Sequence, residues 1–157
     1  MNTFNPEQVF QQMYNIVGCS MNLYNELGYG YSERIYQECL SIICTECSIP
    51  WEREKRLDMY FHHSILEQKY YADFVCYENI IVELKAVERI IPEHRAQLLN
   101  YLRITDSPGG VIVNFGNKER LTSEKYIYDP TTDSYYFVRN KEDIKNELKK
   151  HNFSKIL

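Results

Sequence analysis

Three charged residues lie inside an otherwise apolar stretch of the chain, DFVCYENIIVELKAV, at positions 73–87. Asp73 opens this stretch, and Glu83 and Lys85 lie in its second half. Burying a charged side chain is unfavourable unless the charge is paired or binds a metal. Carboxylates are the ligands that Mg²⁺ and Mn²⁺ prefer. The stretch therefore indicates either a cation site or a surface hairpin whose charges face solvent.

The length of the turn decides whether the two carboxylates of this hairpin face each other. With a loop of two residues Asp73 lies opposite Leu84, whereas a three-residue loop over 77–79 places it directly opposite Glu83. We favour the three-residue loop, in which Asn79 takes the left-handed backbone conformation that Asn tolerates. This register puts both carboxylates on one face of the sheet.

Two directly opposed carboxylates repel each other unless a positive charge lies between them. Lys85 shares a face with Glu83 because strand side chains alternate, but as a neighbour on the same strand it only flanks the pair. The run Ile80–Val82 favours burial of the strand. A divalent cation that bridges the two carboxylates is therefore the better solution, with water completing its shell.

The elements that must position these residues follow from apolar periodicity. Helices are expected over 6–27, over 33–47, from Pro92 to the SPGG stop, and over 141–151. Besides the hairpin, strands are expected over 51–61, 110–116, 125–129 and 134–138. The apolar run of 110–116 suits the centre of a sheet covered on both faces. The order predicts an α/β (α+β mixed) fold with a central mixed β-sheet flanked by helices.

Two of the expected helices carry further polar residues at helical spacing. Glu33 and Tyr36 are three residues apart after Gly30, and Gln97 and Tyr101 are four apart, so each pair shares a helix face. Taken singly, a first-turn Glu and a core Tyr are ordinary features of amphipathic helices. Their occurrence in order with the hairpin makes a pattern.

This pattern, Gly30-x-x-Glu33-x-x-Tyr36, Asp73, Glu83-x-Lys85 and Gln97-x-x-x-Tyr101, resembles the PD-(D/E)XK nuclease superfamily. It is most similar to the small bacterial GxxExxY proteins of that superfamily, over about residues 8–122. The resemblance implies a restriction-endonuclease-like core in a single domain over 1–157, with residues 123–157 peripheral.

The resemblance also implies roles for individual residues. Asp73 and Glu83 would hold the metal, Glu33 would complete the acidic cluster, and Lys85 would orient or activate the attacking water. Gln97 and Tyr101 would steady that Lys or the scissile phosphate. A metal lowers the pKa of bound water, and a neighbouring Lys stabilises charge that develops on the phosphate. In related exonuclease-like branches a Gly often stands three residues before the Asp, where this chain has Tyr70.

Other residues have both a functional and a structural interpretation. Arg53, Lys55 and Arg95 are candidate phosphate contacts, although acidic residues are interleaved along 52–58. His94 could approach the metal or the phosphate, or it could belong to a helix cap. The pair Cys44-x-x-Cys47 could be half of a zinc site, but no second pair follows.

Composition restricts the class of protein. The chain of 157 residues is 44% hydrophobic and 25% charged, which suits one soluble globular domain. No apolar run is long enough for a membrane span, and the start of the sequence lacks the features of a secretion signal. Five cysteines without framework spacing favour the reducing cytoplasm. The net charge of −4 does not favour binding of nucleic acid by bulk attraction.

We therefore expect a Mg²⁺- or Mn²⁺-dependent nuclease that hydrolyses phosphodiester bonds of DNA, with RNA as the alternative substrate. The alternative is a module of the same fold that binds nucleic acid or a protein partner without catalysis.

Overall fold

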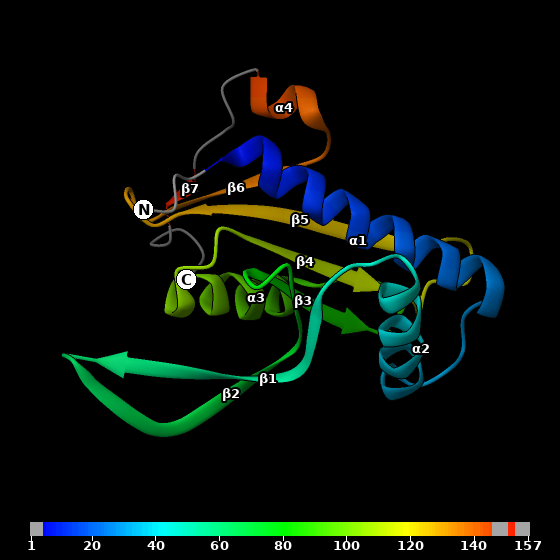
Figure 1. Ribbon diagram of the computed structural model, residues 1–157, viewed down its shortest axis with the longest axis horizontal. Coiled ribbons are helices and arrows are strands. Elements are labelled where there is room, and N and C mark those ends of the chain that lie inside the picture. Colours follow the sequence, from blue (N-terminus) through cyan, green and yellow to red (C-terminus); the bar gives the residue numbers. More distant parts are fainter. Residues whose placement is uncertain (1–4, 146–150, 153–157) are drawn as a thin grey trace.

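The computed structural model describes residues 5–145 and 151–152, and within them the chain forms one mixed β-sheet with helices on both faces (Figure 1). The helices are α1 (Pro6–Leu27), α2 (Glu33–Glu46), α3 (Pro92–Thr105) and α4 (Lys141–Lys145). The strands are β1 (Trp51–Phe61), β2 (Ser64–Cys76), β3 (Ile80–Lys85), β4 (Gly109–Asn114), β5 (Thr122–Asp129), β6 (Ser134–Val138) and β7 (His151–Asn152). The predicted fold class is confirmed.

The sheet has the order β1-β2-β3-β4-β5-β6-β7, and only β3 and β4 pair in parallel among the described strands. Parallel neighbours require a crossover connection, and α3 supplies it. All six residues of β4 are buried, as the apolar run predicted for a central strand. The crossover matters for the site because α3, which follows β3 in the chain, packs on the sheet beside the end of β3.

Two separate clusters of apolar side chains cover the two faces of the sheet. The first packs α1 and α2 on residues such as Ile80, Val82 and Leu84. The second packs α3 on residues such as Ile81 and Ile112. Because side chains alternate along β3, Glu83 lies on the same face as Ile81, which is the face that α3 covers.

Two glycines at the start of β4 allow this close packing from both sides. A Cβ at Gly109 would lie 2.5 Å from Val9 of α1, and a Cβ at Gly110 would lie 2.8 Å from Leu98 of α3. The pair therefore sets how closely both helices approach the sheet.

The long β1–β2 hairpin extends beyond the rest of the domain in Figure 1. Its turn at His62 and His63 has positive φ at both residues. No helix of the described residues is long and apolar enough to cross a membrane.

Two local expectations were wrong. In the β2–β3 turn the left-handed residues are Tyr77 (φ 52°) and Glu78 (φ 68°), not Asn79. The N–H of Asn79 instead donates to the carbonyl of Cys76 at 3.2 Å, so the turn has the two positive φ angles of type I′. His151, placed by sequence in the last helix, begins β7; residues 146–150 of that helix lie outside the described residues.

Candidate active site

The register of β2 and β3 is the one that a three-residue loop requires. Cys76 pairs with Ile80, and the ladder is regular up to the pair of Phe74 and Val82. The next position brings Asp73 opposite Glu83, and here side chains replace the backbone ladder. The N–H of Asp73 donates to Oε1 of Glu83 at 3.2 Å, and Oδ2 of Asp73 accepts from the N–H of Leu84 at 2.8 Å. The carboxylates thus occupy the point where the two strands separate.

Burial and mutual repulsion shape the protonation of this pair. Glu83 is only 4% exposed, and burial together with the Asp73 carboxylate raises its pKa from 4.5 to about 9. Burial also raises the pKa of Asp73, opposed by the hydrogen bond from Leu84, and the carboxylates of Glu33 and Glu54 add to the rise. Lys85 acts in the opposite direction on both groups, but burial outweighs it. The charge of Lys85 therefore compensates the pair only in part.

Lys85 is linked to α3 by a short chain of hydrogen bonds. Its Nζ donates to Oε1 of Gln97 at 3.4 Å, and Nε2 of Gln97 donates to the hydroxyl of Tyr101 at 3.2 Å. Burial and the nearby Glu83 carboxylate raise the pKa of Tyr101. The structure thus brings together Lys85, Gln97 and Tyr101 beside the two carboxylates.

The Gly30-x-x-Glu33-x-x-Tyr36 segment divides into structural and site residues. Gly30 has φ +104°, which favours glycine, and the hydroxyl of Tyr36 donates to the carbonyl of Gly28 at 2.6 Å. The ring of Tyr36 stacks on Phe115 with centroids 4.4 Å apart. Tyr36 therefore fixes the loop before α2, and Glu33 lies exposed in the first turn of that helix.

Two members of the site were not found from the sequence. Gln37 is 6% exposed, and its Nε2 donates to Oε1 of Glu54 at 2.9 Å and to Oδ1 of Asp73 at 3.4 Å. Nε of Arg53 donates to the other end of the Gln37 amide, Oε1, at 2.9 Å. Arg53 and Lys55 of β1 pair with Phe74 and Ala72 of β2, so Glu54, which lies between them, faces Asp73. The φ of Glu54 is 52°, which interrupts the regular strand.

Gln37 lies four residues after Glu33 on α2, so the two side chains share a helix face. This spacing was the sequence feature that could have indicated Gln37 as a member of the site. The alternation of charges along β1 had suggested only a solvated strand for Glu54.

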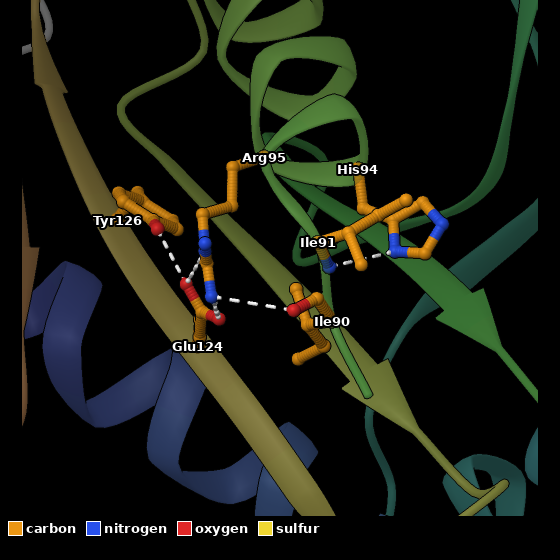
Figure 2. A network of polar contacts seen from close by, with 6 residues as sticks. All are labelled: Ile90, Ile91, His94, Arg95, Glu124 and Tyr126. Atoms are coloured by element: carbon orange, nitrogen blue, oxygen red, sulfur yellow. Dashed lines mark hydrogen bonds and ion pairs between the residues drawn. The ribbon is translucent and has the colours of Figure 1, made fainter. Parts of the chain in front are cut away.

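The basic residues predicted to contact phosphate have partners within the protein. Besides Arg53, whose partner is Gln37, Nζ of Lys55 pairs with Glu52 at 2.7 Å on the exposed surface. Figure 2 shows Arg95 held by Glu124 of β5, with Nε 2.7 Å from Oε1. Their role in nucleic-acid binding remains a prediction.

Further contacts of Figure 2 tie α3 to the sheet and fix its start. The hydroxyl of Tyr126 donates to Glu124 at 2.6 Å, and Arg95 also donates to the carbonyl of Ile90 at 3.4 Å. Nδ1 of His94 accepts the N–H of Ile91 at 3.2 Å. The cap interpretation of His94 fits this geometry, and burial lowers its pKa.

The donor set at the two strands has the chemistry of a hard-cation site, because two opposed carboxylates lack a positive partner between them. Glu33 does not complete a triad with them: across residues 5–145 and 151–152, no three His, Cys, Asp or Glu side chains come close enough to hold a metal. The same finding gives no support to a zinc site at Cys44 and Cys47, and every described cysteine is free.

The comparison with family models shows to which family the chain belongs. The model described as PD-(D/E)XK nuclease superfamily matches residues 10–126. The chain belongs to this superfamily. It therefore carries a nuclease-type domain.

A solved structure titled "Crystal structure of SSO0001" is also similar. It is 19% identical, with a TM-score of 0.49, and the match covers 64% of this chain and 53% of that chain. The chain thus spans about half the length of that protein. The search of curated proteins found no match.

Proposed function

We propose that this protein is a Mg²⁺- or Mn²⁺-dependent nuclease that hydrolyses phosphodiester bonds of DNA, and that residues 1–157 act as one nuclease-like domain. The observation that carries the proposal is the opposed pair of Asp73 and Glu83 with Lys85 beside it. Glu83 is buried and Asp73 is partly buried, and two such carboxylates with raised pKa values favour a divalent cation, which would replace the protons.

Asp73 and Glu83 would hold the cation, and the backbone carbonyl of Leu84 could add a ligand. When bound, the metal would lower the pKa of a water molecule and neutralise charge on the phosphate. The exposed Glu33 is the candidate for a water-mediated contact.

The protein's own residues would supply the remaining chemistry. The ammonium group of Lys85 would stabilise charge on the phosphate or orient the attacking water, because Gln97 holds it at the edge of the carboxylate pair. Tyr101 fixes the amide of Gln97 from the other side. The proposed site would thus combine carboxylate ligands for the cation with the ammonium group of Lys85.

Cleavage assays with DNA and RNA oligonucleotides in Mg²⁺ or Mn²⁺ test the proposal. We expect Asp73→Asn and Lys85→Ala each to reduce cleavage by about a hundredfold or more, as for removal of a positioned electrostatic group. Glu67→Gln and Lys141→Ala, which change exposed residues, are the matched controls. Equal cleavage by parent and both site variants would refute the assignment.

Calorimetric titration with Mn²⁺ separates catalysis from the alternative of a non-catalytic binding module. A nuclease should bind Mn²⁺ in a manner that depends on Asp73 and Glu83. A module that has lost its chemistry should show no binding that these two residues control.

A further inference from the structure

A second feature of the α3 face is a cavity next to the candidate site. Its volume is about 600 Å³, within the range of small-ligand sites. Strand β1, strand β2 and helix α3 line it with the residues Met59, Tyr70, Glu93, Ala96, Gln97, Asn100, Tyr101, Arg103 and Ile104. The walls are mainly apolar and aromatic, with a few amide and charged groups.

The cavity and the candidate site share two residues. Gln97 and Tyr101 line the cavity, and the same two side chains form the hydrogen-bonded chain that begins at Nζ of Lys85. Tyr70, on the opposite wall, lies three residues before Asp73 on β2. A ligand in the cavity would therefore lie one side chain away from the position proposed for the scissile phosphate.

The aromatic rings indicate the chemical class of the ligand. The rings of Tyr70 and Tyr101 have centroids 5.6 Å apart at an interplanar angle of 52°. Tyr101 is only 5% exposed, so the partly exposed ring of Tyr70 is the surface on which a nucleobase of any sequence can stack, and the exposed amide of Asn100 can hydrogen-bond a base edge. The charged groups at the rim do not favour a phosphate here, because Glu93 is acidic and Arg103 is ion-paired with Asp133 at 2.8 Å.

We propose that this cavity binds the unpaired nucleobase of a nucleotide next to the cleaved phosphate. The inference rests on the proposed nuclease function and specifies its substrate. In duplex DNA the bases are stacked and paired, so a base enters such a cavity only from a single strand, a frayed end or an extruded nucleotide. The protein should therefore prefer single-stranded over double-stranded substrate.

The test measures binding of a fluorescein-labelled single-stranded DNA oligonucleotide without cleavage. Asp73→Asn protein in EDTA serves for this purpose, and a series of oligonucleotides carries one abasic nucleotide at successive positions. We expect removal of one particular base to weaken binding by between about 5-fold and 150-fold. An RNA oligonucleotide of the same sequence, in parallel, shows which polymer supplies the base.

Filling the cavity should abolish this penalty. Ala96→Phe places a ring in the cavity from its α3 wall, and Asn100→Trp does so from an exposed position that tolerates substitution more readily. With either variant, folded by circular dichroism, intact and abasic oligonucleotides should bind equally and weakly. Quenching of 2-aminopurine at the sensitive position should be lost in the same variants.

The outcomes separate this inference from the proposed function. The base-binding cavity is overturned if removal of no single base weakens binding of either DNA or RNA, or if the weakening persists in the filled variants. Either result has this consequence even if the parent protein cuts DNA. An abasic penalty that disappears in the filled variants supports the cavity even if no metal yields cleavage, in which case only the nuclease proposal fails.

Discussion

Replacing Glu83 by Gln should flatten the pH dependence of stability in the metal-free protein. Glu83 is 4% exposed, and its pKa is raised from 4.5 to about 9, chiefly by burial and then by Asp73. Between these two pH values the folded protein retains a proton that the unfolded chain has released. The free energy of unfolding must therefore fall as the pH rises through this window.

The size of the effect follows from linkage. One retained proton lowers the free energy of unfolding by about 1.4 kcal/mol per pH unit, or about 2.7 kcal/mol between pH 6 and pH 8. For a chain of this length, 1 kcal/mol corresponds to about 2–4 °C in Tm. Glu83 alone should thus lower Tm by roughly 5 to 11 °C over this interval. Glu83→Gln, which cannot titrate, should lose that part of the slope.

Thermal unfolding in EDTA, followed by circular dichroism at pH 6, 7 and 8, measures the difference between parent and variant. Glu67→Gln, on the exposed part of β2, is the matched control and should retain the parental slope. If Glu83→Gln and the parent show the same slope, Glu83 does not retain a proton, and the effect assigned to its burial and to Asp73 is wrong.

Adding Mg²⁺ extends the same experiment. A cation binds the deprotonated carboxylates, so it competes with the protons and stabilises the folded state. Saturating Mg²⁺ should raise Tm more at pH 8 than at pH 6. A rise that is equal at both values would show that the cation binds elsewhere.

Three further perturbations test the packing around the site. Gln37→Leu removes the amide that donates to Asp73 and leaves that acceptor without its donor. We expect the free energy of unfolding to fall by about 1–3 kcal/mol in denaturant titration, and Mn²⁺ binding to weaken in calorimetry. Unchanged Mn²⁺ affinity would contradict a positioning role for the amide. Gly110→Ala should destabilise the protein by about 1–3 kcal/mol, because its Cβ would lie 2.8 Å from Leu98. Gly18→Ala, in α1 with nothing within 4 Å of its Cβ, should instead stabilise the protein by about 0.5–1 kcal/mol. If urea unfolding showed both variants stabilised or both destabilised, the close-approach argument would be refuted. Glu124→Leu leaves the partly exposed Arg95 without its carboxylate partner and should cost about 1.5–3 kcal/mol, while a neutral result in the same assay would mean that this ion pair does not hold α3 to β5.

The arrangement of residues at the centre of the candidate site could be predicted from the sequence, because it depends on local rules. Strand alternation places Glu83 and Lys85 on one face, and the length of the turn places Asp73 opposite Glu83. Helical spacing then places Gln97 and Tyr101 together, and the crossover between parallel strands carries them back to Lys85.

The periphery of the site could not be predicted in the same way. Glu54 faces the site at a φ of 52°, a backbone angle that strand periodicity does not anticipate. Arg95 was a candidate phosphate contact, but its partner Glu124 lies 29 residues away on a strand whose register the sequence left open. The turn at 77–79 has the predicted length, yet its left-handed residues are Tyr77 and Glu78, because a type I′ turn places positive φ at its two central positions.

The carboxylates of Asp73 and Glu83 accept the N–H groups of Leu84 and Asp73 where the two strands separate. Any ion that draws on the oxygen lone pairs of these carboxylates must change the electron density that the two amide hydrogens sense. Their resonances in an ¹⁵N-correlated NMR spectrum are therefore an intrinsic indicator of occupancy. Two peptide groups could thus record ion binding in real time, before a substrate is known and without any bond being cut.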